Sequence, residues 1–217
     1  PSFRIPERKR RPAYYTEILR EVQALPGVRA AALVSVLPLS GGEVMVAFAK
    51  SQAAALRGES YLVVPYREVS PDYFRVMGIP VLLGRGFTDA DTAGAPHVAV
   101  VNEVLARRYW PGENPVGKSL PVGESLPVVG VVGNVKHRSL SAEPGPELYQ
   151  CYLQGLGDPY ANLAIRTHAD PAALAATVRR KIRELHSDQP VGEVKTLKEV
   201  VAGSLATPRF YTLLLGC

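Results

Sequence analysis

The sequence predicts an α+β fold in which a ferredoxin-like lobe of β-α-β units carries an inserted, small, mostly-β lobe. Two echoing segments support the first lobe, because LREVQALPGVRA and IRELHSDQPVGE each show a helix end, a loop, a proline and a strand start. Residues 87–160 lie between them and contain short apolar runs separated by Gly and Pro, which is typical of a compact β lobe. We therefore expect residues 1–86 and 161–206 to share one sheet, with 87–160 inserted.

A helix and two strands are expected early in the chain, after a strand tail at SFRI. The helix ends before Pro26 and Gly27, and its apolar residues recur at three- and four-residue steps. They are Tyr14, Tyr15, Ile18, Leu19, Val22 and Leu25. VRAAALVSVLPL has the composition of a buried strand. After a polar, Gly-rich hairpin region, YLVVPYREV is the next strand, in which Pro65 indicates an edge or a bulge.

A short helix, SPDYFRVM, comes next. Ser70 is its expected N-cap, with Pro71 at the first helical position and Asp72 in the first turn. Gly78 is the residue favoured just past a helix end. IPVLLGRGF follows as a strand and turn, and the polar residues 88–96 indicate a boundary between lobes.

The inserted lobe is expected to begin with the short strand HVAVV. Asn102 then caps a helix that carries Val101, Leu105 and Tyr109 on one side and ends at Pro111-Gly112. Three further short strands are predicted, at KSLPV, LPVVGVVGNV and ELYQCYL.

The last third repeats the strand-helix-strand order. ANLAIRTH is a strand, and Asp170-Pro171 starts a helix with Leu174, Val178, Ile182 and Leu185 on one face. VGEV is a short strand, and Thr196 with Glu199 forms a capping box for a last helix. Residues 207–217 contain the apolar stretch FYTLLLGC, which we interpret as the start of a membrane helix, with an ordinary core segment as the alternative.

The stretch GENPVGKS, residues 112–119, matches the phosphate-binding loop pattern G-x-x-x-x-G-K-[ST]. Such a loop follows a buried strand and opens a helix, because the helix N-terminus supplies the anion site. Here a helix precedes the stretch and a strand follows it. We therefore predict that it binds no nucleotide, and that Gly112 and Gly117 provide turn geometry while Pro115 stiffens the connection.

The charge and the cysteine content of the chain exclude few classes of function. The chain has 217 residues, a hydrophobic fraction of 47% and a net charge of +5, so it can bury a core. A basic run at residues 8–11 suits a nucleic-acid or anionic-lipid patch, but a solvated approach to the helix is the favoured interpretation. Cys151 and Cys217 show neither a disulfide framework nor metal-ligand spacing, and both are expected to be unpaired.

No catalytic, cofactor or metal site is expected from the remaining polar residues. His97, His137, His168 and His186 lie at separate turns and helix ends, as solvated or capping residues would. The chain has no G-x-S-x-G around Ser35 or Ser40, which lie near a strand end. A pair of carboxylates brought together by folding stays open.

Several quoted stretches together resemble one family. They are ALPGVRAAALVSVLPLSGG, VSPDYFRVMGIPVLLGRGFTDAD, VAVVNEVLARRYWPGENPVGKSL, VVGVVGNVKHRSL and TPRFYTLLLG. In this order they resemble the MacB-like periplasmic core domain of bacterial ABC-transporter permeases of the macrolide-export and lipoprotein-release kind. The likeness is strongest to duplicated permeases without a fused ATPase.

The resemblance implies a porter-type lobe beside the inserted lobe, held between two membrane helices on the periplasmic side of the bacterial inner membrane. It implies no catalytic residue and no cofactor. Its implied partners are the membrane helices of the same permease, a cytoplasmic ATPase subunit and a periplasmic adaptor or cargo, with a homodimer left open. Both chain ends should then leave the fold at one pole.

The implied function is therefore binding of a partner or cargo and transmission of ATP-driven motion for export. A periplasmic hydrolase with a site formed only on folding is the rival reading, and a nucleotide-binding module is the third. Relative to the family, the first strand is cut short before Ser2, and the hairpin region at residues 41–60 is shorter.

Overall fold

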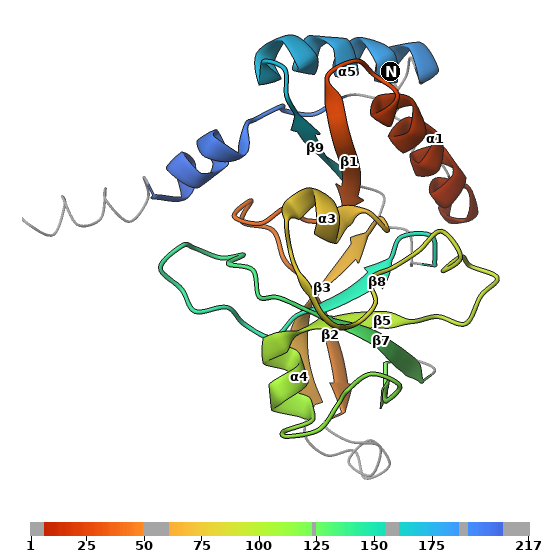
Figure 1. The fold of residues 1–217 in the computed structure, drawn as a ribbon, viewed down its shortest axis with the longest axis vertical. Helices are drawn as coiled ribbons and strands as arrows, with labels where there is room; N and C mark the ends of the chain where they lie inside the picture. The colour runs from red at the N-terminus through yellow and green to blue at the C-terminus, as the bar shows by residue number, and fades with distance from the viewer. Residues whose placement is uncertain (1–6, 50–60, 123–124, 155–160, 187–190, 206–217) are drawn as a thin grey trace, which may run out of the picture.

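The computed structural model describes residues 7–49, 61–122, 125–154, 161–186 and 191–205. Nine strands form one mixed sheet in these residues (Figure 1). They are β1 (Val28–Val34), β2 (Val44–Ala49), β3 (Tyr61–Val69), β4 (Val81–Gly84), β5 (Ala99–Asn102), β6 (Ser119–Leu120), β7 (Leu126–Val132), β8 (Leu148–Cys151) and β9 (Asn162–Thr167).

The helices lie in several places around the sheet (Figure 1). The described helical elements are the 3-10 turn η1 (Arg8–Arg10), the helices α1 (Arg11–Gln23), α3 (Tyr73–Met77), α4 (Glu103–Tyr109) and α5 (Pro171–Leu185), and a last helix that covers residues 197–205. In Figure 1, α1 and α5 lie at the upper end around β1 and β9, whereas α4 lies at the lower part of the sheet. The α+β class with a large mixed sheet is therefore confirmed.

The sheet joins distant parts of the chain. Its order is β4-β7-β5-β8-β3-β1-β9, with β2 paired to β3 and β6 paired to β7. β9 is antiparallel to β1, with Ala32 opposite Ala164. The expected pairing of residues 161–168 with a strand from the N-terminal part is thus confirmed. The ferredoxin-like detail and the division into lobes at 86, 160 and 206 stay predictions.

The junction between β1 and β3 is short and is reinforced by two serine hydroxyls. Val34 and Val69 are the registered pair there. The Ser70 hydroxyl accepts from the Leu33 N–H at 2.9 Å, and the Ser35 hydroxyl accepts from the Glu68 N–H at 3.1 Å. The backbone N–H groups of Ser35 and Ser70 in turn donate to the carbonyls of Glu68 and Leu33. The two strands therefore exchange bonds reciprocally at this point.

This arrangement corrects the expected role of Ser70. The short helix begins at Tyr73, with Asp72 in the N-cap position and no side-chain cap. The Ser70 hydroxyl serves the β1–β3 junction instead, because the buried Leu33 N–H requires an acceptor there. Gly78 ends the helix in the left-handed conformation, at φ 73°, as predicted.

Two apolar clusters cover the two faces of the sheet, since neighbouring residues of one strand point to opposite faces. On β8, Tyr149 and Cys151 belong to the first cluster, together with buried residues of α1, α3 and α5. Leu148 belongs to the second cluster, together with α4 and the β2–β3 hairpin. Cys151 is buried and unpaired, as expected, whereas Cys217 lies outside the described residues.

Near the end of the part of the chain that the structure describes, one predicted strand is absent and one predicted helix cap is confirmed. Residues 191–194, predicted as a strand, have no strand structure, because no neighbouring strand pairs with them in the described part. The capping box is confirmed: the Thr196 hydroxyl accepts from the Glu199 N–H, and Glu199 accepts from Thr196. Residues 207–217 and the chain ends fall outside the described residues. Across the described ranges, no helix is long and apolar enough to span a bilayer.

Asp91 anchors the polar stretch that follows β4. Its side chain is 7% exposed, and its Oδ2 accepts from Arg85 Nη1 at 2.7 Å and from the Thr88 N–H at 2.8 Å. The hydrogen bond from Arg85 is the main reason that the pKa of Asp91 lies below its ordinary value. The ionised form is therefore favoured in the folded state.

We expect Asp91→Asn to lower the free energy of unfolding at neutral pH and to flatten its dependence on pH in acid. A carboxyl whose pKa is lowered on folding stabilises the fold above its unfolded pKa, and this contribution disappears as the pH falls through the folded value. Urea titrations of both proteins from pH 7 downwards measure the effect. Parallel curves for the two proteins would contradict it.

Candidate functional site

Two charged residues are buried side by side in the middle of the sheet. Arg67 lies on β3, and its register partner across the parallel ladder is Tyr149 on β8. Glu147 lies two residues before Tyr149 and therefore on the same face. The Nη1 atom of Arg67 forms an ion pair with Oε1 of Glu147, and the two side chains are 1% and 3% exposed. Removing both charges from water costs free energy that their pairing must offset.

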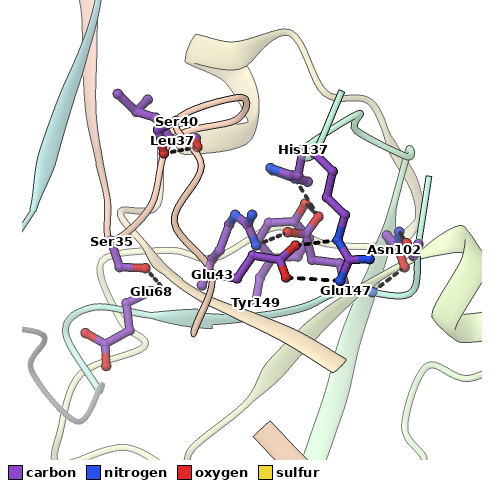
Figure 2. A network of polar contacts seen from close by, with 12 residues as sticks. Ser35, Leu37, Ser40, Glu43, Glu68, Asn102, His137, Glu147 and Tyr149 are labelled. Atoms are coloured by element: carbon purple, nitrogen blue, oxygen red, sulfur yellow. Dashed lines mark hydrogen bonds and ion pairs between the residues drawn. The ribbon is translucent and has the colours of Figure 1, made fainter. Parts of the chain in front are cut away.

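Two further side chains converge on the same carboxylate (Figure 2). The Tyr149 hydroxyl donates to Oε2 of Glu147 at 2.5 Å. His137 places its Nε2 at 2.7 Å from the same oxygen. We call Arg67, Glu147, Tyr149 and His137 the buried cluster. Both oxygens of its carboxylate have protein partners, so the arrangement favours holding chain segments together over proton transfer to a substrate.

His137 is not the solvated or capping residue that its position near a turn predicted. Its side chain is 10% exposed and lies in the segment 133–147 between β7 and β8. The His137 carbonyl accepts from the Leu39 N–H at 2.8 Å, and the next residue, Arg138, forms an ion pair with Glu43 at 2.7 Å. His137 and Arg138 therefore fasten segment 133–147 both to the sheet and to the β1–β2 connection.

Burial determines the protonation of the tyrosines around the cluster. Burial is the main reason that the pKa of Tyr149 is raised well above its ordinary value, and the negative charge of Glu147 raises it further. The pKa of Tyr73, which packs near Tyr149, is raised for the same two reasons. Both phenols stay protonated at neutral pH, so Tyr149 acts as a hydrogen-bond donor to the carboxylate.

Asn102 connects the cluster to α4. Its Oδ1 accepts from the Leu105 N–H at 2.9 Å, which confirms the predicted helix cap. The same oxygen accepts from the Glu147 N–H at 2.9 Å, and Nδ2 donates to the Gly145 carbonyl at 2.7 Å. One buried amide therefore fixes the helix start and the backbone on which Glu147 is mounted (Figure 2).

The phosphate-loop match lies away from these residues and has the geometry of a turn. α4 precedes it and β6 follows it, so no helix begins at Lys118. Gly112 and Gly117 have φ values of 75° and 86°, which favour glycine. Lys118 pairs with Glu113, and its backbone N–H donates to the Pro115 carbonyl. The predicted turn role is confirmed, and the absence of nucleotide binding stays a prediction.

The other residues considered from sequence are not brought together. His97 and His168 are exposed, whereas His186 packs on the Tyr14 ring with a centroid distance of 4.2 Å. The Ser40 hydroxyl donates to the Leu37 carbonyl. Within the described ranges, no group of three His, Cys, Asp or Glu side chains could hold a metal ion.

Sequence reasoning missed Arg67 and Glu147 as members of a site. The available signal was the alternation of YLVVPYREV, in which Arg67 falls on the same side as Val69 and so on a buried face. A charged residue at such a position requires a partner of opposite charge. Nothing in the sequence indicated which of the distant carboxylates would supply it.

We expect Glu147→Gln to lower the free energy of unfolding by roughly 3–5 kcal/mol, because it leaves the Arg67 charge buried without its counter-charge. The double variant Arg67→Met/Glu147→Leu should lose much less, since both charges are then absent. Urea denaturation of Arg67→Met, of Glu147→Leu and of the double variant forms the double-mutant cycle. If the losses in the two single variants simply add in the double variant, the pairing is not what stabilises this region.

GENPVGKS is expected to show no saturable binding of ATP with magnesium, because its residues form a turn between a helix and a strand. Isothermal titration calorimetry measures this directly. A binding isotherm that Lys118→Ala abolishes and that Lys136→Ala preserves would contradict the prediction.

The chain is similar to solved structures of transporter domains. The periplasmic region of MacB from Actinobacillus actinomycetemcomitans is 15% identical with a TM-score of 0.56, over 79% of this chain and 74% of that chain. The extracellular domain of the noncanonic ABC-type transporter YknZ from Gram-positive bacteria is 16% identical with a TM-score of 0.57, over 80% of this chain and 84% of that chain. These likenesses show a shared fold.

The family itself is shown by a match along most of the sequence. No curated protein matches the chain. The model of the MacB-like periplasmic core domain matches residues 3–185, which include every strand and helix from η1 to α5. The chain therefore belongs to the family of MacB-like periplasmic core domains, as its sequence resemblance indicated.

Proposed function

We propose that this chain is the non-catalytic extracytoplasmic domain of an ABC-transporter permease that binds a periplasmic adaptor or cargo and transmits ATP-driven motion for export. The observation that carries the proposal is the family match over residues 3–185. The proposed setting is the periplasmic side of the bacterial inner membrane. Its proposed partners are the membrane helices of the same permease and a cytoplasmic ATPase subunit.

The continuous sheet supports a mechanical role. β9 and β1 lie at one end of the strand order and β4 at the other, with hydrogen-bonded neighbours between them. A displacement of α1 and α5 therefore reaches the strands of residues 87–160 through backbone bonds rather than through a flexible linker. In this proposal, residues 1–86 and 161–206 form the porter-type lobe that receives the motion, and 87–160 form the inserted lobe that presents the binding surface.

The chemistry of the buried cluster supports a role without catalysis. Glu147 is 3% exposed and lies 2.7 Å from a histidine nitrogen, and its oxygens face Arg67, Tyr149 and His137. An enzyme would require an acid or base within reach of a substrate. The cluster instead joins β3, β8 and segment 133–147.

The location is tested by labelling Ser141→Cys in the full-length permease with a membrane-impermeant maleimide. Ser141 is exposed, so the thiol should react in intact cells whose outer membrane alone has been permeabilised. A cysteine placed in a cytoplasmic loop of the same permease is the control and should react only after lysis. Reaction of Ser141→Cys only after lysis would contradict the proposed side of the membrane.

The transmission of motion is tested with spin labels at Ser141→Cys and Ala176→Cys, both exposed positions. Pulsed electron resonance in membranes should give different distance distributions during ATP turnover and after trapping with vanadate. A permease paired with an ATPase that cannot hydrolyse ATP serves as the control. Identical distributions in all three states would overturn the proposed transmission and leave the location untouched.

A further inference from the structure

Positive charge is concentrated in the two long helices. Residues 8–23 and 171–185 contain nine Lys and Arg against three Glu, a formal charge of +6. The whole chain carries +5, so all other residues together sum to −1. The protein is therefore basic only because of η1, α1 and α5, which we call the helical layer.

The two helices of this layer lie together in space. Nζ of Lys181 on α5 is 2.8 Å from Oε2 of Glu21 on α1, and the ring of His186 packs on that of Tyr14. In Figure 1 both helices lie at the upper end of the molecule, away from α4. Cations that are distant in sequence therefore lie on two helices that pack together.

The apolar sides of both helices face the core, which directs the cations outward. Leu174, Val178 and Ile182 of α5 belong to the first apolar cluster, as do Ile18 and Val22 of α1. Side chains on the opposite side of each helix must then point to the surroundings. The exposed cations include Lys9, Arg10, Arg20, Arg180 and Arg183.

Internal ion pairs leave a surplus of positive charge. Glu21 pairs with Arg20 and Lys181, and Glu184 lies 3.7 Å from Arg180. Glu17 lies 3.8 Å from His186. Three carboxylates cannot neutralise nine cations, so these two segments together carry a net positive charge.

We propose that the helical layer docks onto the anionic phosphate headgroups of the membrane that holds the permease. The inference rests on the proposed function, because only a domain tethered to a membrane meets lipid at high local concentration. Lys and Arg near an anionic bilayer are attracted within about one Debye length, roughly 10 Å at moderate salt. Arginine also binds phosphate oxygens with two parallel hydrogen bonds, and arginines predominate in the layer.

Lipid is favoured over nucleic acid by the shape and composition of this surface. The cations lie on two packed helices whose apolar sides are already buried, and no nucleic-acid recognition motif accompanies them in the sequence. A bilayer presents phosphates over a broad area, which suits a basic surface without base-reading side chains. In the proposed location, the domain is tethered to a membrane and so is held near its lipid headgroups.

The experiment is co-sedimentation of the chain with vesicles at low salt. One set of vesicles is phosphatidylcholine alone, and the other contains about 30% phosphatidylglycerol, a composition with a strong negative surface potential. The chain should bind the anionic set only, and binding should weaken as salt is added. Failure to bind, or equal binding to both sets, would overturn the proposal, whatever the labelling of Ser141→Cys shows.

A matched pair of variants tests which cations are responsible. Arg179→Gln/Arg180→Gln/Arg183→Gln should lower the partition coefficient roughly tenfold or more, given the attraction per basic residue near such membranes. Arg107→Gln/Arg108→Gln/Lys118→Gln removes the same charge in and after α4 and should lower it by no more than about twofold. Equal losses in both variants would overturn the assignment to the helical layer.

Two controls keep the test decisive. Changing the three α5 arginines to lysine keeps the charge and should keep most of the binding, and circular dichroism shows whether each variant is folded. A DNA duplex at the same phosphate concentration competes for the surface. Tighter binding to DNA than to anionic vesicles at equal salt would overturn the proposal in favour of nucleic acid.

Discussion

The ion pair between Arg67 and Glu147 is the interaction on which the centre of this fold depends. It holds β3 beside β8, and β8 is the strand through which β5 and β7 attach to the rest of the sheet. Tyr149 and His137 approach the second carboxylate oxygen of this pair, and Asn102 holds the backbone of Glu147. Each added contact offsets part of the desolvation cost. His137 and Glu147 lie in the long segment 133–147, so the same contacts also hold this segment against the sheet.

Local chemistry made much of this architecture predictable. Asn102 and Asp170 each cap a helix through a side-chain oxygen, and Gly78 ends a helix in the left-handed conformation. These roles could be predicted because capping involves only residues a few positions apart. Periodicity also identified the buried sides of α1 and α5. These features depend on residues that are close in sequence, so they can be predicted from a single sequence.

Features that depend on distant partners were not predictable. Arg67 and Glu147 are joined by the parallel pairing of β3 with β8, and no local pattern encodes that pairing. Ser70 had the signature of a helix cap, yet its hydroxyl bonds to Leu33, because the β1–β3 junction competes for the same group. The stretch VGEV has strand composition but finds no partner in the described residues. A segment with high strand propensity forms a strand only where a neighbouring strand supplies its hydrogen-bond partners.

The reciprocal serine bonds at the β1–β3 junction have a consequence for stiffness. Two strands that pair over many residues resist bending along their whole length. Two strands that pair over few residues bend mainly where they are joined. Here β1, β9 and the helices above them meet β3 at Val34 and Val69, beside the bonds of Ser35 and Ser70. The strand pairing between β1 and β3 is therefore narrow, and the first apolar cluster, which contains residues of α1, α3, β1 and β8, also packs across it. We expect any relative motion of the parts on either side to concentrate at this short pairing, where the serine bonds keep β1 and β3 in register.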